Sequence, residues 1–480
     1  MKYFVKVFGC QMNQSDAERI ATYLEKYKLK LASSIDEANL IVFVTCGVRQ
    51  SAEDRVYGQI NNIKKKYLDK KIVLTGCLSH RKDVQRRLKG KVDLFCEIKS
   101  FPQAVSPFLK GGLRGILNKQ FNRKNLSSTL PLVKGECFDY LDITLKYTNS
   151  YTAYIPIMTG CNNFCAYCVV PFARGREYSR PADDILKEVK SLVKKGCKEI
   201  ILLGQNVNSY KNLTPTLSLS RRGSEKKINF PKLLRLIEKI PGKFWLSFLT
   251  SHPKDMSDDL IEIIAKSKKI CEYISLPAQS GDNEILRKMN RKYSIEHYKR
   301  LIKKIRGSFQ RFNLSCTAKV EPCISTDIIV GFPGETKKQF ENTAKLLREM
   351  KFDMAYIAQY SPRPQTLAWK MKDNVSKKEK ERRDKMLTDI LSKTALENNK
   401  KYIGKVVEVL VDKRFDLEEF RAPARKGKVE PWMGKYLAHT RTQKKVIFHS
   451  NKKIPVGIAP HHNASELVRG EFRESQNREI

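Results

Sequence analysis

The sequence lacks membrane-type apolar segments and is poor in acidic residues, and both features limit the class of protein it can be. No apolar run of about 18 residues occurs, and Met1 to Gln11 contains no basic segment followed by an apolar signal core. Acidic residues are few, because 51 Asp and Glu stand against 92 Lys and Arg, a formal net charge of +41. We therefore expect a cytoplasmic protein without a membrane partner, whose charge is met by a polyanion.

Nucleic acid is the leading candidate for that polyanion. A lysine-rich proteome would explain part of the excess charge, but hardly all of it. A chain of 480 residues is long enough for about three domains. Its 12 cysteines are better explained as metal ligands and buried thiols than as disulfides, because the cytosol keeps thiols reduced.

Three cysteines at one compact spacing form the most informative motif. Cys161, Cys165 and Cys168 make a C-x3-C-x2-C array. A [4Fe–4S] cluster usually has four thiolate ligands, so three leave one iron free for an exchangeable ligand. A structural zinc site is the alternative, but it needs four ligands in two separated pairs, and no second pair follows at the usual interval.

The first hundred residues predict a βαβαβ pattern. Runs rich in β-branched and aromatic residues at 2–8, 40–45 and 72–75 are typical of strands, and 15–27 and 51–67 have helical apolar spacing. Parallel strands joined in this way bring their C-terminal ends to one edge of the sheet, where α/β folds place their ligands. We expect a Rossmann-like domain.

Each of these strands is followed by a cysteine: Cys10, Cys46 and Cys77. If the strands are neighbours, the three thiols converge at one edge of the sheet and form a second three-thiolate site with an open position. Three unrelated cysteines buried in a packed core are the alternative, since free cysteine is often buried.

These motifs resemble those of a known family. The first array, with Tyr167 directly before its last cysteine, resembles the radical S-adenosylmethionine enzymes, in which the open iron binds S-adenosylmethionine and the cluster cleaves it by donating an electron. The stretches FGCQMNQSD (8–16), TCGVR (45–49) and TGCL (75–78) resemble the N-terminal signatures of the methylthiotransferases within that group. The resemblance implies two [4Fe–4S] clusters, one on each cysteine set, the auxiliary N-terminal cluster carrying the sulfur that is methylated and inserted.

The middle of the chain, 145–375, predicts six βα units and thus a partial (β/α)6 barrel with its chemistry at the C-terminal ends of the strands. The expected strands are 151–158, 199–204, 244–250, 272–276, 327–330 and 354–360, and the expected helices lie near 182–194, 232–239, 258–266, 295–304 and 338–350.

Polar residues in the loops after these strands are candidates for cofactor binding. Amide side chains can donate and accept hydrogen bonds at once, which binding of an amino acid requires. Any one of these loops could be an ordinary turn, but together they follow successive strand ends. With Tyr167, the candidates are Gln205, Asn206, Ser251, Gln279, Gly331 and Glu335. His252 is expected in a turn or beside the cofactor, without a general-base role.

The stretches GQNVNSY (204–210) and SPRP (361–364) resemble the branch that acts on isopentenyl-bearing adenosine in transfer RNA. This resemblance implies insertion of a methylthio group at C2 of N6-isopentenyladenosine at position 37 of tRNA, with S-adenosylmethionine and a reducing electron donor. Methylthiotransferases for threonylcarbamoyl-adenosine or for a ribosomal protein remain alternatives. A non-catalytic iron–sulfur RNA-binding protein is an alternative of another class.

Basic stretches outside the two cysteine sets have two interpretations each. The RGREYSR stretch (174–180) could hold substrate phosphates, or be solvated charge before a helix. A charged helix at 376–400 is expected to be a connector. Beyond it, strands near 404–411 and 435–448, with Arg441, Lys444 and Lys445, resemble the small RNA-binding TRAM barrel.

The expected organisation is α/β, in five parts: a domain with the auxiliary cluster (1–135), a radical S-adenosylmethionine core (145–375), the connector (376–400), a TRAM-like domain (401–460) and a tail (461–480). Residues 413–433 and those after about Gly457 depart from the family pattern, so the barrel could be altered. Residues 213–227 are expected to be a polar surface loop. Gln365 stands where relatives often have glycine.

Overall fold

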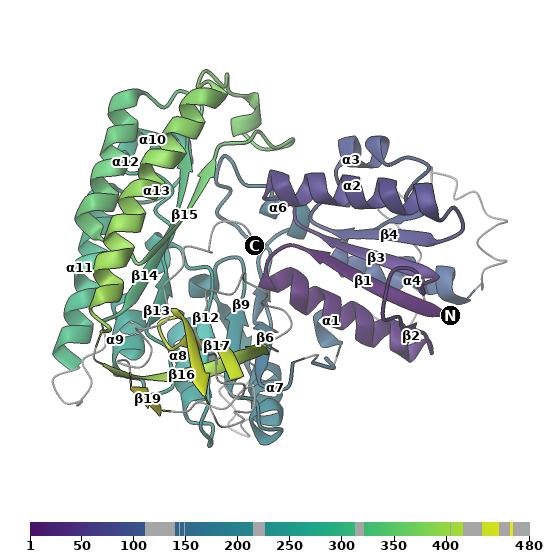
Figure 1. Ribbon diagram of the computed structural model, residues 1–480, viewed down its shortest axis with the longest axis horizontal. Helices are drawn as coiled ribbons and strands as arrows, with labels where there is room; N and C mark the ends of the chain where they lie inside the picture. Colours follow the sequence, from purple (N-terminus) through teal and green to yellow (C-terminus); the bar gives the residue numbers. More distant parts are fainter. Residues whose placement is uncertain are drawn as a thin grey trace, which may run out of the picture.

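The computed structural model describes residues 1–110, 140–143, 145–147, 149–214, 226–312, 321–403, 405–415, 434–450 and 461–463. Within these residues the N-terminal unit lies beside the central α/β unit, and a C-terminal sheet lies at one end of the latter (Figure 1). The expected regions 111–139, 215–225, 416–433 and the tail after 463 fall outside the described residues. None of the described helices is long and apolar enough to cross a membrane.

The N-terminal unit is a five-stranded parallel sheet in the order β2-β1-β3-β4-β5. Apolar clusters fill both of its faces, one under α1 and α4 and the other under α2 and α3 (Figure 1). The strands are β1 (Lys2–Phe8), β2 (Lys30–Leu31), β3 (Leu40–Thr45), β4 (Lys71–Gly76) and β5 (Leu94–Phe95). The helices are α1 (Gln11–Lys26), α2 (Gln50–Lys66), α3 (Lys82–Arg87) and α4 (Phe101–Lys110).

The register of this sheet decides where its cysteines lie. Phe8 pairs with Thr45, and Thr45 with Gly76, so β1, β3 and β4 end level with one another. The βαβαβ prediction and the adjacency of its three strands are confirmed, and the three following cysteines start from one edge.

The central unit contains six parallel strands in chain order, hydrogen-bonded as two three-stranded sheets. A bridge joins the two sheets, since Leu246 N–H donates to Lys269 O (2.8 Å) and Cys271 N–H to Leu246 O (2.9 Å). The described strands do not close into a barrel. The first sheet has β6 (Thr152–Pro156), β9 (Glu199–Leu203) and β12 (Trp245–Phe248); the second has β13 (Tyr273–Ser275), β14 (Cys323–Val330) and β15 (Met354–Gln359).

Helices cover the outer face of these strands around the largest apolar cluster. Their starts are set by local chemistry: the Ser257 hydroxyl caps α9, and Thr336 and Gln339 form a capping box on α12. The helices are α6 (Val170–Arg174), α7 (Ala182–Lys194), α8 (Phe230–Glu238), α9 (Asp258–Lys266), α10 (Asn283–Lys288), α11 (Ile295–Phe312) and α12 (Lys337–Met350).

Two short pairings lie outside the main strands. β7 (Met158–Thr159) pairs with β8 (Tyr178–Ser179), closing the segment that carries the C-x3-C-x2-C array. β10 (Lys211–Thr214) pairs antiparallel with β11 (Lys226–Asn229). The ends of the expected 213–227 loop therefore form a hairpin stem, because their backbone groups satisfy each other.

The C-terminal region begins with α13 (Lys377–Lys400), capped by the Ser376 hydroxyl and packed along α12 and β15 (Figure 1). The helix is therefore part of the central unit rather than a free connector. An antiparallel sheet follows in the order β18-β17-β16-β19: β16 (Val406–Phe415), β17 (Gly434–Thr440), β18 (Lys445–Ser450) and β19 (His461–Asn463). Its described strands do not form a closed barrel.

Candidate active site between two sets of cysteines

The three N-terminal thiols meet at the edge of the first sheet. Cys10 is the N-cap residue of α1, and Cys77 N–H donates to Thr45 O (2.8 Å), next to Cys46. Burial raises the pKa of Cys46 to about 11, with further increases from the nearby Cys77 and Cys10 thiols. A Cβ on Gly47 would lie 3.2 Å from the Cys77 Cβ, so the backbone approaches closely here. The structure brings the first predicted set together.

A buried ion pair lies against these thiols. Arg174, at the end of α6, donates to the Asp16 carboxylate of α1 (2.6 Å), and both side chains are at most 4% exposed. Burial raises the pKa of Cys10, and Arg174 partly offsets that increase. The Cys77 and Cys10 thiols in turn help to raise the pKa of Arg174. The Tyr140 hydroxyl also donates to Asp16. A fixed positive charge from the central unit thus stands beside the N-terminal set.

A second buried network holds the loop after Cys46. Arg363 donates to Glu53 (2.9 Å), to the Gln50 amide oxygen (2.9 Å) and to the carbonyl of Val48 (3.0 Å). Glu53 is also paired with Arg81 (2.7 Å), so one carboxylate serves two guanidinium groups. Arg363 belongs to the SPRP stretch after β15, and it therefore ties the central unit to the N-terminal cysteine loop.

The central cysteine set lies on a loop built by backbone contacts. Cys161 N–H donates to Gly175 O (3.2 Å), and Cys168 N–H to Cys165 O (3.0 Å). Phe164 has a φ of +48°, and its carbonyl accepts from the Asn290 amide (2.9 Å). The loop is therefore tightly wound after β6, and its three thiols lie close enough to raise one another's pKa.

Burial and a nearby arginine act in opposite directions on the thiols of this loop. Burial raises the pKa of Cys168 to about 12, so the free thiol stays protonated near neutral pH and a bound metal would have to displace that proton. Arg291 donates to the Cys165 sulfur (3.5 Å) and supplies positive charge. Tyr167 is half-buried near Arg291, and burial raises its pKa well above the usual value.

No three His, Cys, Asp or Glu side chains among the described residues are placed to share one metal ion. Thiolates of a [4Fe–4S] cluster bind different iron atoms, so they need not meet at a single point. Two sets of three convergent thiols, each next to an arginine, fit such clusters better than they fit a mononuclear zinc site.

Several candidate cofactor residues present unpartnered polar atoms. Among the described residues, buried oxygens of Gln205, Asn206 and Ser251 have no hydrogen-bond partner, and neither does the side chain of Asn208. A buried polar atom without a partner is costly, which indicates that a ligand completes it. These atoms follow β9 and β12, at the C-terminal edge of the sheet where the Cys161 loop also begins. Donors and acceptors of this kind fit an amino acid ligand such as S-adenosylmethionine.

The other candidates contribute mainly backbone geometry. Gln279 has a φ of +68°, and its N–H donates to Asp327 O (2.7 Å). Gly331 has a φ of +69°, and its N–H donates to Glu335 (2.7 Å). The Glu335 carboxylate also accepts from Arg383 (2.7 Å), so its partners within the protein already satisfy it. Glu335 supports the loop after β14.

The structure corrects both interpretations of the RGREYSR stretch for two of its three arginines. Arg174 and Arg180 are neither solvated nor free for phosphates, because both are buried and paired with Asp16 and Glu188. Arg176 is exposed and lies over the Phe164 ring.

The basic residues of the C-terminal sheet are likewise engaged. Arg441 pairs with Glu272 (2.8 Å) and Lys444 with Asp353 (2.9 Å), so these two hold the sheet to the central unit instead of facing RNA. Lys445 pairs with Asp412.

Two smaller expectations agree with the structure. His252 Nδ1 accepts from Lys254 N–H, and burial lowers the pKa of His252 to about 2, so it is a neutral turn residue. Gln365 has a φ of +75°, which explains why glycine suits that position.

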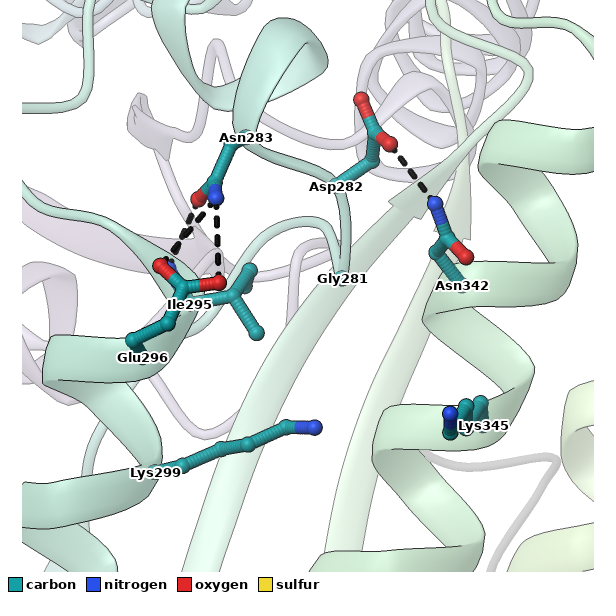
Figure 2. Close-up of a pocket in the computed structure, with 8 residues that line it drawn as sticks. All are labelled: Gly281, Asp282, Asn283, Ile295, Glu296, Lys299, Asn342 and Lys345. Atoms are coloured by element: carbon teal, nitrogen blue, oxygen red, sulfur yellow. Dashed lines mark hydrogen bonds between the residues drawn. The ribbon is translucent and has the colours of Figure 1, made fainter.

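A recess of about 260 Å³ lies away from the cysteines, between α10, α11 and α12 (Figure 2). Its polar side chains satisfy one another: Asn283 donates to Glu296 (3.1 Å) and Asn342 to Asp282 (2.8 Å). None of the predicted site residues lines it, and its lining shows no unpartnered group for a ligand.

The comparisons with known proteins agree with this geometry. Residues 155–347 match the Radical SAM superfamily, and residues 2–97 match Uncharacterized protein family UPF0004. The chain is 38% identical to a tRNA-2-methylthio-N(6)-dimethylallyladenosine synthase of Clostridium botulinum, over 90% of this chain and 91% of that protein. The chain belongs to the tRNA-2-methylthio-N(6)-dimethylallyladenosine synthase family. The synthase of Alkaliphilus oremlandii is 39% identical, over 86% and 82% of the two chains.

The family prediction is therefore confirmed, and with it the prediction of iron–sulfur clusters and S-adenosylmethionine as cofactors. Among solved structures, the radical S-adenosylmethionine methyltransferase TsrM of Kitasatospora setae has a TM-score of 0.52 at 13% identity, covering 76% of this chain and 73% of that one. This similarity supports the fold alone.

Sequence reasoning missed the structural role of the arginines that hold the cysteine loops. Arg174, Arg363 and Arg291 look like ordinary basic residues in a chain with 92 of them. Their positions gave the available signal: Arg174 lies six residues after Cys168, and Arg363 lies within the SPRP motif. The structure shows that each is buried against a cysteine loop.

Proposed function

We propose that this protein is a tRNA methylthiotransferase that inserts a methylthio group at C2 of N6-isopentenyladenosine at position 37. The convergence of two three-thiol sets, linked by buried arginines, is the observation that carries the proposal. When bound, two [4Fe–4S] clusters and S-adenosylmethionine supply the electron, the sulfur and the radical chemistry that an unactivated C–H bond requires.

We propose that Cys161, Cys165 and Cys168 hold one cluster and leave its fourth iron for S-adenosylmethionine. The unpartnered atoms of Gln205, Asn206 and Ser251 would bind and orient the polar groups of that ligand. The remaining candidates, Tyr167, Gln279, Gly331 and Glu335, would shape the surrounding loops.

Cys10, Cys46 and Cys77 would hold the auxiliary cluster. Arg174 offsets negative charge there, and the Arg363 network fixes the position of the Cys46 loop. Both arginines come from the central unit, so the protein's own contacts keep the two cysteine sets at a constant separation.

The boundaries between the domains are part of the same proposal. We assign 1–135 to the auxiliary-cluster domain, 145–375 to a partial-barrel core, 376–400 to a helical segment, 401–460 to a TRAM-like RNA-binding domain and 461–480 to a tail. Sequential parallel strands in the core and an antiparallel C-terminal sheet support these assignments. The cytoplasmic location, the absence of a membrane partner and the reducing electron donor stay predictions.

Iron and acid-labile sulfide per chain test the cofactor assignment. Anaerobically reconstituted protein should hold about eight irons, and the Cys161/Cys165/Cys168 triple Ala variant about four. Cys165→Ala should lose S-adenosylmethionine cleavage, whereas Cys197→Ala, at a buried thiol outside both sets, should keep it. A wild type with about four irons and a triple Ala variant with none would contradict an N-terminal cluster.

Incubation with tRNA that carries or lacks the isopentenyl group tests the substrate. Mass spectrometry of the digested nucleosides should show methylthiolation only of the isopentenyl-bearing tRNA. Modification of threonylcarbamoyl-adenosine or of a ribosomal protein instead would replace this assignment. RNA binding without consumption of S-adenosylmethionine would leave a non-catalytic iron–sulfur protein.

A further inference from the structure

Asp327 lies on the inner face of β14, opposite the helices. Ile324, Ile328 and Val330 of the same strand belong to the apolar core under the helices. Because side chains alternate between the two faces of a strand, Asp327 lies on the opposite face. Asp327 is directly beside Tyr356 of β15 in the sheet register, and the Tyr356 side chain is 40% exposed. The inner face of this half of the central unit therefore borders accessible space.

The inner face of the other half is closed by contrast. Ile201 and Leu203 of β9 are buried against Met12 from α1 of the N-terminal unit. Figure 1 shows α1 next to β6 and β9, while β14 and β15 lie farther along the same array of strands. The Tyr356 side of the inner face is thus left accessible, whereas α1 covers the β9 side.

The Asp327 carboxylate has no hydrogen bond or ion pair within the described part of the chain; only its main-chain carbonyl accepts, from Gln279. Burial raises the pKa of Asp327 to about 6, and Arg291 and Arg49 act in the opposite direction. Asp327 is half-buried, and a half-buried carboxyl in a perturbed environment, with no partner in the described chain and beside an exposed aromatic ring, is typical of a binding site.

The position of Asp327 relates it to both cysteine sets. Arg291 lies near Asp327 and also donates to the Cys165 sulfur (3.5 Å). Arg49 lies near Asp327 as well and follows Cys46 by three residues. A reaction that draws on both sets must hold its reacting atom near both, and this carboxylate lies near an arginine from each of the two cysteine loops.

We propose that Asp327 and Tyr356 bind the adenine base of the RNA substrate, the carboxylate accepting the N6–H and the Tyr356 ring packing on the base. This inference rests on the proposed function. Carboxylates accept hydrogen bonds from exocyclic amino groups of bases, and aromatic rings stack on extruded bases. An adenosine with one N6 alkyl group keeps one N–H, and a contact there leaves C2 free.

A binding cycle tests the contact without requiring turnover. The experiment compares two RNA hairpins that differ at one nucleoside. The first carries N6-dimethylallyladenosine, which keeps one N6–H. The second carries N6-methyl-N6-dimethylallyladenosine, in which a methyl group replaces that hydrogen. The reconstituted wild type should prefer the first by roughly tenfold or more, the range for a hydrogen bond to a charged group. Asp327→Leu should bind both hairpins alike, and Asp327→Asn, which keeps an acceptor, should retain part of the preference.

Ser325→Ala is the matched control, because Ser325 lies on the same face of β14 and carries no charge. This variant should keep the wild-type preference. An unchanged preference in Asp327→Leu would overturn the inference, and so would a wild type with no preference that still methylthiolates its tRNA. If Asp327→Leu does not fold, the same criterion applies to Asp327→Asn. Failure of the wild type to modify any tRNA would instead remove the proposed function.

Discussion

The Arg174 guanidinium lies 2.6 Å from the Asp16 carboxylate, and this pair joins the central unit to the N-terminal unit at the first cysteine set. Asp16 follows Cys10 in α1, and Arg174 ends the helix after Cys168. Cys77 and Cys161 lie 84 positions apart in the sequence. This buried ion pair, together with the buried Arg363–Glu53 pair, nevertheless holds the two units together beside the cysteine loops. The predictions below concern the contacts that maintain this arrangement.

Removal of Asp16 should destabilise the protein strongly. Asp16→Asn leaves Arg174 as a buried charge without its anionic partner, which typically costs about 3–5 kcal/mol of unfolding free energy. Urea unfolding followed by circular dichroism measures the loss. Glu37→Gln, at the exposed Lys2–Glu37 pair, is the control and should change the free energy of unfolding little, because solvent screens an exposed ion pair. Equal effects of the two variants would contradict a special role for the buried pair.

Arg363→Lys should weaken the N-terminal cluster site selectively. One ammonium group cannot serve Glu53, Gln50 and Val48 together, whereas the forked guanidinium does so. Iron retention is best measured in the Cys161/Cys165/Cys168 triple Ala background, where the remaining iron reports the N-terminal set alone. Arg382→Lys, in an exposed pair with Glu379, is the control and should retain its iron. An iron content in the Arg363 variant equal to that of its parent would show that the loop after Cys46 keeps its position without this network.

Gly160→Ala should disrupt the loop of the central cysteine set. Gly160 has a φ of +79°, and an added Cβ would lie 2.0 Å from the Arg176 carbonyl oxygen. Because that obstacle is backbone, the loop must move, and the variant should lose S-adenosylmethionine cleavage together with about four irons per chain. Gly58→Ala, where the added Cβ enters open space beside α2, should retain both S-adenosylmethionine cleavage and a normal iron content. A normal iron content in Gly160→Ala would refute the expected clash.

The attachment of the C-terminal sheet should weaken at high pH. His439 contacts Asp412 (2.6 Å) and Glu199 (3.3 Å), and these carboxylates raise its pKa to about 9 despite burial. The folded pKa exceeds the unfolded value of about 6.5, so the stabilisation is complete below pH ~6.5 and is lost as the pH rises through ~9. The change is on the order of 3 kcal/mol.

Thermal unfolding between pH 6 and 10 measures this loss. His439→Gln should remove most of the pH dependence in that range. His297→Gln, at a half-buried site on α11, should keep the wild-type profile. A His439 variant with an unchanged profile would assign the pH dependence to other groups.

Local patterns determined much of the fold. β1, β3, α7 and α9 begin and end where apolar periodicity predicts, because strand and helix periods are properties of neighbouring residues. The spacing of Cys161, Cys165 and Cys168 is equally local. Parallel connection of β1, β3 and β4 also follows from the chain, since helical crossovers leave few alternatives.

Local patterns could not show that 376–400 packs on the core or that 213–227 starts and ends as a hairpin stem. Both depend on which distant surface is available to each segment: α13 packs against α12 and β15, and β10 pairs with β11. The outcome is set by tertiary contacts that override local preference.

The sequence by itself determined the cysteine sets, the order of strands and the resemblance to the family. Only the tertiary structure decided the partners of its charges: Arg174 with Asp16, Arg363 with Glu53, Arg441 with Glu272, and Asp327 with none in the described residues. The physical reason is that periodicity identifies the residues an element buries, whereas an ion pair forms between side chains hundreds of positions apart, and only the packing of complete elements brings them within reach.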